Sequence, residues 1–405
     1  MVFQKVIFGN WEKAAPLREA ASYADIYDDP HELILTDEYW YLYYKFGGQF
    51  RPPENPQPLL GWVGHFDRYT LKHQDHDKVK GRIPVLFFGD SFSICVGAKC
   101  FEEILNEDST FASKYYLLNY GVGGYGVDQI YLLAREVIPM YDNPVVFFGF
   151  MTRDMDRNIL KFRTGQKPYF EIDNDQLVLK NTPIDPDPAE YVENNMPYIP
   201  SYIMRYLRNS IVNYIPANDY RNVRKVEHMK NLNAKILSTA QNMLERDSIH
   251  YRFLVFSALW KGDREWRNIA VRDHLERNNV PYLWVRDMIE QDAHFGGPAT
   301  AFFEDANNGH PTTYQNELIC DAMMKSLFDS TYAATIDSIN TDYYLSIRNE
   351  YDLYHIDHYA YKIRRDPNYM IEIKRKAEER GISVDSMHQL DSRYLLEKFK
   401  RAQFN

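Results

Sequence analysis

The chain has 405 residues, a net charge of −10 and an apolar content of 45%. At about 150 residues per domain the length suggests two or three folding units, and the average composition argues against a disordered or fibrous protein. The acidic balance disfavours nucleic acid or an anionic membrane as a partner for the whole surface. Residues 359–405 differ from the rest of the chain in being net basic, since they carry 11 Lys and Arg against 7 Asp and Glu.

The N-terminus does not match a secretory signal, because it lacks a run of about 7–15 apolar residues after a basic stretch. No segment reaches the roughly 18 apolar residues that a membrane span requires. We expect no transmembrane span, and a cytoplasmic protein as written or an exported one if a leader has been removed. Cys95, Cys100 and Cys320 cannot form a disulfide framework or a CxxC pair, so we expect buried thiols and no metal ion.

Residues 1–80 are rich in Tyr, Trp, Pro and His and show little periodicity, which predicts an irregular N-terminal cap. One aromatic cluster is interpreted as packing on the neighbouring domain, with a sugar-binding platform as the alternative; it consists of Tyr39, Trp40, Tyr41, Tyr43 and Tyr44. Another cluster has the chemistry of metal ligands, but we expect a hydrated loop there; it consists of His73, Asp75, His76 and Asp77.

The middle of the chain alternates between two patterns. Short apolar runs typical of buried strands lie at 83–88, 115–120, 144–150, 251–257 and 280–285. Stretches with helical spacing lie at 127–141, 219–246, 266–278 and 314–328. Because strands that alternate with helices form parallel sheets covered on both faces, residues 81–330 are predicted to form a three-layer α/β/α domain with a five-stranded, mainly parallel sheet. Its ligand site is expected at the carboxyl ends of the strands.

Two further segments fall outside that pattern. Residues 161–215 read as an insertion that decorates the site, with Asn174-Asp175 as a hairpin turn. Residues 331–405 read as a helical C-terminal extension in which Gly381 ends one helix and Ser383 begins the next. The basic face of this extension is interpreted as solvated, with docking on an acidic domain or a membrane surface as the alternative; it carries Lys374, Arg375, Lys376 and Arg380.

The first predicted strand ends in Gly89-Asp90-Ser91, with a helix expected just after it. A serine there exposes its hydroxyl at the edge of the sheet, and the amides of the next turn point at any oxyanion bound to it. This position suits a nucleophile. The alternative is a turn and helix cap made by Asp90 and Ser91.

The second predicted strand ends in a glycine-rich loop. Gly121, Gly123 and Gly126 match the G-x-G-x-x-G dinucleotide fingerprint, for which Asp154 would supply the required acid. That fingerprint normally sits on the first strand of its unit, whereas here the strand bearing Ser91 comes first. We therefore favour the interpretation in which the glycines let backbone amides approach a substrate oxyanion.

His310 lies in a loop after the last predicted strand, with Asp305 close before it. A histidine in that loop can reach a serine on the first strand across the strand ends. There it acts as general base, with a carboxylate or amide orienting its ring. The alternative is a structural histidine.

Taken in this order, the blocks resemble the SGNH or GDSL hydrolases over about residues 80–330. The resemblance implies a flavodoxin-like fold, Ser91 as nucleophile, His310 as base, an oxyanion hole that includes the amides of Ser91 and Gly124, and no cofactor. The sequence around the glycine block, residues 119–137, followed by residues 151–158 and 167–179, is similar to larger bacterial members associated with surface polysaccharides, which implies an acylated carbohydrate as substrate.

This chain departs from the family pattern at two places. The third block usually reads G-x-N-D with the asparagine as oxyanion donor, whereas this chain has Met151-Thr152-Arg153-Asp154. Arg153 either donates in its place or pairs with Asp154 or Asp156. The final block usually has an aspartate two or three residues before the histidine, where this chain has Asn308 and Asn307. Asp305, an asparagine or a backbone carbonyl is then left to orient His310.

These features predict a serine esterase that removes O-acyl groups, in particular O-acetyl groups, from a carbohydrate through an acyl-enzyme on Ser91. The same site is an O-acyltransferase to a polysaccharide if a sugar hydroxyl intercepts the acyl-enzyme. The two departures also suit a degenerate domain that binds a glycan or a partner without turnover.

Overall fold

The computed structural model describes residues 19–24, 36–47, 52–212, 219–257, 266–292, 302–303, 310–328, 363–364 and 367–402. The chain divides into two compact units, of which the first comprises Met1–Val285 and Phe303–Ala333 and the second Arg286–Phe302 and Ala334–Asn405. Among the described residues, no helix is long and apolar enough to cross a membrane.

The first unit is built on a five-stranded sheet in the order β2-β1-β3-β6-β7, and every pairing in it is parallel. The predicted strands are confirmed, and their bounds are β1 Ile83–Gly89, β2 Tyr115–Gly121, β3 Val145–Met151, β6 His250–Phe256 and β7 Tyr282–Trp284. The chain order reverses between β1 and β3, so the crevice at the carboxyl ends of these two strands is where open α/β sheets bind their ligands.

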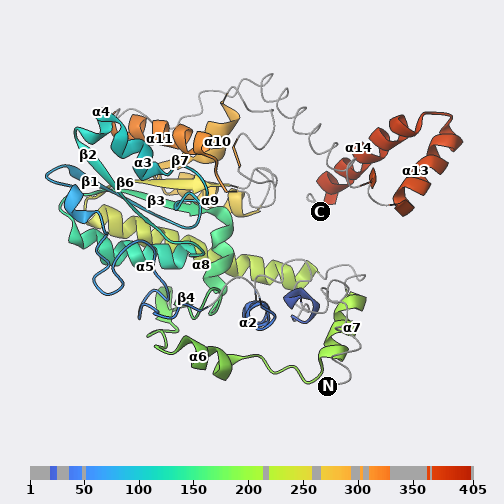
Figure 1. Cartoon of the computed structure of the whole chain (residues 1–405), viewed down its shortest axis with the longest axis horizontal. Coiled ribbons are helices and arrows are strands. Elements are labelled where there is room, and N and C mark those ends of the chain that lie inside the picture. The colour runs from blue at the N-terminus through green and yellow to red at the C-terminus, as the bar shows by residue number, and fades with distance from the viewer. Residues whose placement is uncertain are drawn as a thin grey trace. The chain divides into compact units, whose positions relative to one another are not determined.

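Helices cover both faces of the sheet (Figure 1), which confirms the three-layer α/β/α prediction. One face carries α5 Val127–Val137, which continues into η5 Ile138–Met140, together with α8 Asp219–Arg246 and α9 Trp266–Arg277. The other face carries α3 Phe101–Glu107, α4 Ser109–Ala112 and α11 Thr313–Phe328. The short helix α10 covers Val285–Glu290.

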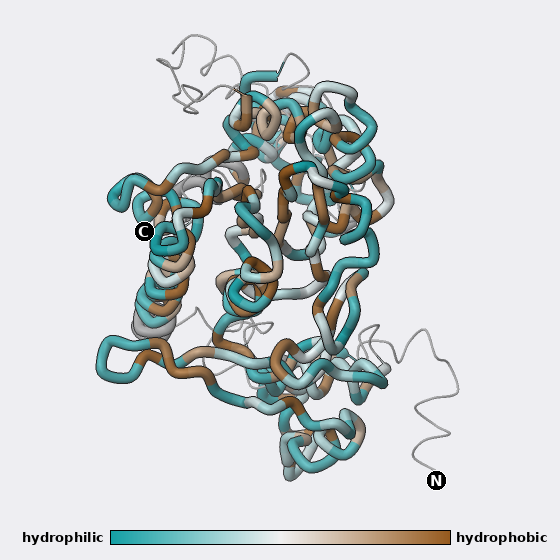
Figure 2. Tube along the Cα trace, turned by 90° about the vertical axis from the view of Figure 1, so that its left-hand side faces the viewer, coloured by the Kyte–Doolittle hydropathy of each residue, from teal (hydrophilic) through white to brown (hydrophobic). Residues whose placement is uncertain are grey.

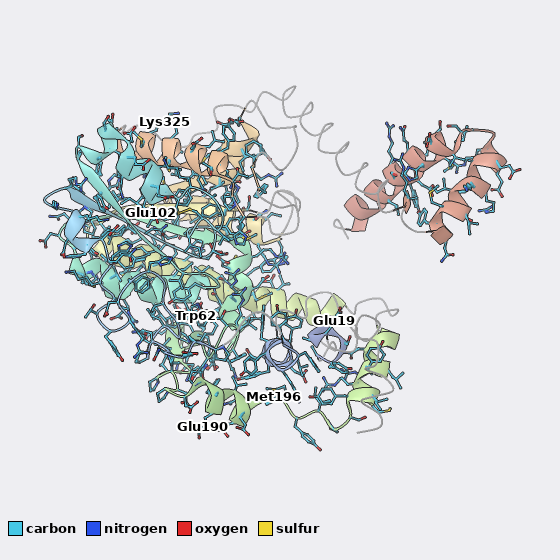
Figure 3. The ribbon with its side chains drawn as sticks, in the orientation of Figure 1. Glu19, Trp62, Glu102, Glu190, Met196 and Lys325 are labelled. Carbon is cyan, nitrogen blue, oxygen red and sulfur yellow. A yellow bond between two sulfur atoms is a disulfide. The ribbon has the colours of Figure 1, made fainter. Side chains whose placement is uncertain are left out.

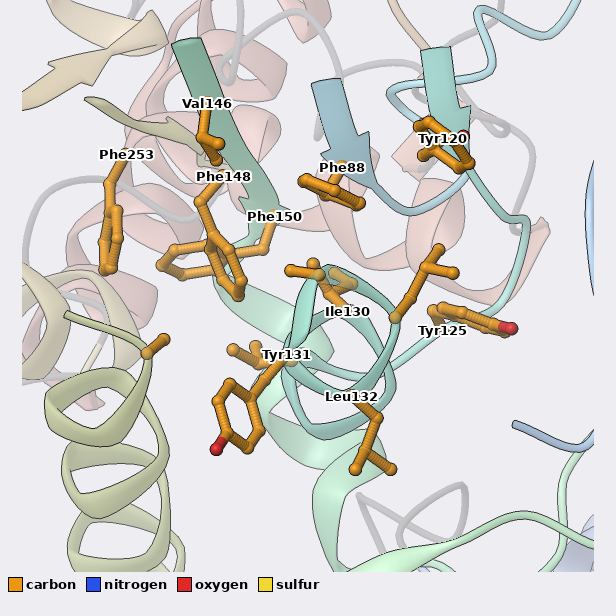
Figure 4. Packing of buried hydrophobic residues seen from close by; sticks show 14 of the residues in the cluster. Phe88, Tyr120, Tyr125, Ile130, Tyr131, Leu132, Val146, Phe148, Phe150 and Phe253 are labelled. Carbon is orange, nitrogen blue, oxygen red and sulfur yellow. The ribbon is translucent and has the colours of Figure 1, made fainter. Parts of the chain in front are cut away.

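Side chains of β1 alternate between the two layers. Phe88 of β1, together with Phe148 of the neighbouring strand β3, packs against Ile130 of α5 (Figure 4). The ring of Phe87, the preceding residue of β1, lies on the opposite face, 4.9 Å from the ring of Phe101 on α3. A strand buried on both faces needs apolar residues at every position, which explains its continuous apolar run. Such runs alternate with hydrophilic stretches along the trace (Figure 2).

The predicted hairpin is present as β4 Tyr169–Asp173 and β5 Gln176–Lys180. Its turn residues Asn174 and Asp175 have φ angles of 48° and 59°, the left-handed geometry that two-residue hairpin turns require and that Asn and Asp tolerate. The segment leading to the hairpin is η6 Thr152–Ile159, and the segments after it contain α6 Pro188–Asn195 and α7 Tyr202–Val212.

The N-terminal cap is less irregular than predicted, because it contains η2 Ala20–Ser22, the helix α2 Asp37–Lys45 and η4 His76–Lys78. Thr36 caps α2 by accepting from the amide of Tyr39. Trp40 and Tyr41 are buried, and the ring of Tyr41 stacks 4.2 Å from that of Phe162 in the insertion. The aromatic cluster of α2 therefore packs on the protein, as expected.

The described part of the second unit consists mainly of two helices, α13 Pro367–Arg380 and α14 Val384–Ala402 (Figure 1). Gly381 follows α13 with a φ of 63°, and the hydroxyl of Ser383 accepts from the amide of Ser386, so both predicted helix ends are confirmed. A small apolar core joins the helices; it consists of Ile363, Ile373, Ala377 and Met387.

Two predictions around Ser91 are wrong. Cys95 and Cys100 are joined by a disulfide and are not thiols, whereas Cys320 is a buried thiol as expected. Residues after Ser91 form turns and not a helix, and α3 begins only at Phe101. The left-handed φ angles of Cys95 (54°) and Gly97 (79°) explain why a helix cannot continue there.

Candidate active site

Ser91 lies in a tight turn directly after β1. The amides of Ser93 and Ile94 donate to the carbonyl of Asp90 over 3.1 and 3.3 Å, and the amide of Phe92 donates to the Asp90 carboxylate over 3.0 Å. Asp90 is fully buried beneath the turn, whereas Ser91 is only partly buried. Asp90 therefore caps the turn, and Ser91 is left at its accessible side.

One guanidinium ties this turn to two other segments. Arg157 Nη1 lies 3.5 Å from Asp90 Oδ2 and 2.5 Å from Asp154 Oδ1, and it donates to the carbonyl of Tyr125 over 2.6 Å. Burial raises the pKa of Asp154 well above its ordinary value; Arg157 opposes this rise, and the neighbouring Asp90 adds to it. Arg157 thus links the ends of β1 and β3 to the glycine-rich loop.

The glycine-rich loop after β2 lies beside the Ser91 turn. The amide of Val122 donates to the carbonyl of Gly89 over 2.9 Å, and a Cβ atom on Gly123 would lie 3.5 Å from Ile94 Cδ1. Among the described residues, the amides of Ser91 and Gly124 donate to no partner, although Gly124 is buried. These two amides are therefore candidate donors for an oxyanion hole.

Arg163 closes the far side of this loop. Its Nη1 atom donates to the carbonyl of Gly124 over 3.0 Å, and its guanidinium lies 4.9 Å from the ring centre of Trp40. Burial lowers the pKa of Arg163 to about 9, with the charge of Arg157 adding to the effect, so the group still carries its charge at neutral pH. Arg163 of the insertion thereby contacts both the glycine-rich loop and Trp40 of the cap.

The dinucleotide interpretation fails at the start of α5. A pyrophosphate needs the amides at that helix N-terminus, but the amide of Asp128 donates to Asn158 Oδ1 and that of Gln129 to Asp128 Oδ1. Asp154, the acid that the fingerprint would use for a ribose, is fully buried against Arg157. Gly121 and Gly126 instead allow close packing, because a Cβ atom there would lie 2.9 Å from Ile94 Cγ2 and 2.5 Å from Asn158 Oδ1.

His310 lies next to the Ser91 turn. Its ring centre is 5.2 Å from that of Phe92, the residue after Ser91. The following Pro311 forms a β-bridge with Phe303, and Thr313 Oγ1 accepts from the amide of Lys99 over 2.9 Å. These contacts hold the segment around His310 against the loop that follows Ser91, so His310 lies beside Phe92 although the two residues are far apart in the sequence.

The remaining predicted site residues have different outcomes. Arg153 follows β3, is partly buried and makes no hydrogen bond or ion pair with another described residue. The alternative pairings are wrong, because Asp154 pairs with Arg157 and Asp156 pairs with Arg267 at 2.6 Å. Asp305, Asn307 and Asn308 lie outside the described residues.

In the histidine cluster of the cap, His73 has a structural role. His73 is buried, its Nε2 atom contacts the carbonyl of Asn119 at 3.1 Å, and its Nδ1 atom accepts from the amide of Asp75 at 3.0 Å. The prediction of a hydrated loop is therefore wrong for His73. Within the part of the chain that the structure describes, no three His, Cys, Asp or Glu side chains gather to hold a metal ion.

Sequence reasoning did not find the role of Arg157. Its spacing of three residues from Asp154 was the available signal, because such pairs share one side of a helical turn. The longer contacts to Asp90 and Tyr125 have no local signature.

No protein-family model matches this chain, and no curated protein matches it. Among solved structures, it is similar to a psychrotrophic esterase, EstA from Pseudoalteromonas sp., with 11% sequence identity and a TM-score of 0.32. The similarity covers 60% of this chain and 96% of the esterase chain. The fold assignment given above rests on the strand order and not on this similarity.

Proposed function

We propose that the protein is a serine esterase of the SGNH type that cleaves O-acyl esters of a carbohydrate through an acyl-enzyme on Ser91. The observation that carries the proposal is the meeting of three features at the carboxyl end of β1. They are an accessible serine, two amides without a described partner at Ser91 and Gly124, and the His310 ring against Phe92.

The proposed reaction begins when Ser91 Oγ attacks the ester carbonyl and His310 takes the hydroxyl proton. The amides of Ser91 and Gly124, with Arg153 as a third donor, stabilise the negative charge on the carbonyl oxygen. The intermediate then collapses, and the proton on His310 passes to the departing sugar oxygen. Water repeats the sequence on the acyl-enzyme and releases a carboxylic acid and free Ser91. Asp305 is proposed to orient His310.

The carbohydrate part of the proposal rests on the family resemblance and on the aromatic content of 15%, since aromatic faces commonly contact sugars. If a sugar hydroxyl replaces water in the second half, the product is a new ester and the enzyme is an acyltransferase. The two reactions share every group named above and differ in the acceptor alone.

The test is turnover of p-nitrophenyl acetate and of an acetylated oligosaccharide, with and without a glycan acceptor. Ser91→Ala is expected to abolish turnover. Ser93→Ala is the matched control, because Ser93 is buried and its hydroxyl contacts no polar partner among the described residues. Acetyl transfer that exceeds hydrolysis would favour the transferase. Absence of turnover on every ester, or equal activity of Ser91→Ala and wild type, would contradict the proposal.

A further inference from the structure

Trp62 (Figure 3) contacts the candidate oxyanion loop from outside the predicted catalytic domain. Its side chain is 7% exposed, and its indole Nε1–H donates to the carbonyl of Gly123 over 3.0 Å. Trp62 precedes β1 and belongs to the segment that the sequence predicted to be only a cap.

The carbonyl of Gly123 and the N–H of Gly124 belong to the same planar peptide group. A hydrogen bond to the carbonyl fixes the plane of that group and so the direction of the Gly124 N–H. It also polarises the group, because hydrogen bonds in series strengthen one another. The Gly124 N–H donates to no other residue among those described, so this polarisation acts on a donor that is available to a ligand.

Trp62 is itself held in place at several points. Its carbonyl accepts from the hydroxyl of Tyr125, and the two rings lie 5.6 Å apart in an edge-to-face arrangement. Just before it, the carbonyl of Leu60 accepts from Gln129 Nε2 of α5 over 2.8 Å, and Gly61 turns the chain with a φ of 90°. A rigidly held donor loses little conformational freedom when the site acts, as preorganised catalysis requires.

We propose that Trp62 is a positioning residue of the oxyanion hole, which orients and polarises the Gly124 amide through the Gly123 carbonyl. The inference rests on the proposed function, since it assigns a task to that same amide. It also assigns the segment around Trp62 to the active site, so the catalytic unit begins before residue 81.

The test compares Trp62→Phe with Trp284→Phe. Both replace a buried tryptophan of the same apolar cluster by a smaller ring, but Trp284 Nε1 has no hydrogen-bond partner among the described atoms. Loss of a complete oxyanion donor costs on the order of a hundredfold or more in kcat. Because the Gly124 amide remains in Trp62→Phe, we expect a loss of about tenfold in kcat with KM within about twofold of wild type. Trp284→Phe should keep kcat within about twofold of wild type.

The measurement is kcat and KM for p-nitrophenyl acetate, expressed per active site titrated with a fluorophosphonate, so that unfolded protein does not count. If Trp62→Phe fails to fold, benzothienylalanine at position 62 keeps the bicyclic ring without the N–H and is expected to show the same loss. Equal kcat of wild type and the Trp62 variant, or equal losses in both tryptophan variants, would overturn the inference alone. An inactive wild type would overturn the proposed function and the inference with it.

Discussion

Gly124 is expected to tolerate no side chain, whereas its neighbour Gly123 should tolerate one. Gly124 has a φ of 86°, in the left-handed region, and a methyl group there would overlap Arg163 Nη1. Gly123 has no such φ, and the nearest atom to an added Cβ is Ile94 Cδ1 at an ordinary 3.5 Å. The substitutions Gly124→Ala and Gly123→Ala therefore make the same chemical change in two different environments.

The cost of Gly124→Ala has two sources. Alanine in the left-handed region costs about 1–2 kcal/mol. The displaced guanidinium also loses its 3.0 Å hydrogen bond to the Gly124 carbonyl, and hydrogen bonds to charged groups contribute roughly 1.5–3 kcal/mol. We predict that the free energy of unfolding falls by about 3 kcal/mol in Gly124→Ala and changes by about 1 kcal/mol or less in Gly123→Ala.

Urea denaturation followed by tryptophan fluorescence measures both values, and p-nitrophenyl acetate turnover reports on the amide. Tilting the Gly124 N–H away from the substrate should lower kcat in Gly124→Ala on the order of a hundredfold. Equal free energies of unfolding of the two variants would refute the reasoning, because neither the left-handed φ of Gly124 nor its contact with Arg163 would then contribute to stability.

Three further predictions concern the groups around the site. Lys167→Met removes the only charge within 3 Å of buried Asp128 Oδ2 among the described residues and should lower the free energy of unfolding by about 3–5 kcal/mol; addition of Asp128→Asn should recover part of the loss in urea denaturation. Burial raises the pKa of Asp154, so the folded protein keeps a proton on this carboxyl group at pH values where the unfolded chain has released it. The resulting contribution to the free energy of unfolding is present at low pH and is lost as pH rises towards the folded pKa. The stability of Asp154→Asn relative to wild type should therefore increase with pH, and a difference independent of pH would contradict the shift. Phe92→Leu removes the ring beside His310 and should cost about 1 kcal/mol in stability and lower kcat; unchanged kcat would show that the ring does not hold the histidine.

The fold was largely predictable because its signals are local. Strands buried on both faces need apolar side chains at nearly every position, so β1 and β3 are continuous apolar runs, and β2 and the buried end of β6 are largely apolar. The hairpin turn at Asn174-Asp175 and the helix end at Gly381 were also predictable, because few residue types adopt a left-handed φ without strain.

The failures have physical reasons as well. A helix was predicted after Ser91 because the residue types there allow one, but Cys95 adopts a left-handed φ and is bonded to Cys100. Neither feature has a signature in the neighbouring sequence. A lone pair of cysteines five residues apart is compatible with thiols and with a bridge, and the geometry decides between them.

The candidate site was predictable only in its motifs. Ser91 and His310 were predicted from the residues beside them, and in the structure the His310 ring lies against Phe92, the residue after Ser91. Arg157 and Trp62 were missed because each acts on a backbone carbonyl far away in the sequence, that of Tyr125 and that of Gly123. Any residue type supplies such a carbonyl, so no pattern marks the partner.

The most direct test of the proposed function is covalent labelling of the folded wild-type protein with a fluorophosphonate, followed by peptide mass spectrometry. An activated serine forms a stable phosphonyl ester, whereas an ordinary serine does not react. We predict one adduct, on Ser91, which is lost in Ser91→Ala and strongly reduced in His310→Ala but retained in Ser93→Ala. Absence of an adduct on Ser91 in the wild type, or an adduct that persists at the same site when His310 is removed, would contradict a serine esterase that uses His310 as its base.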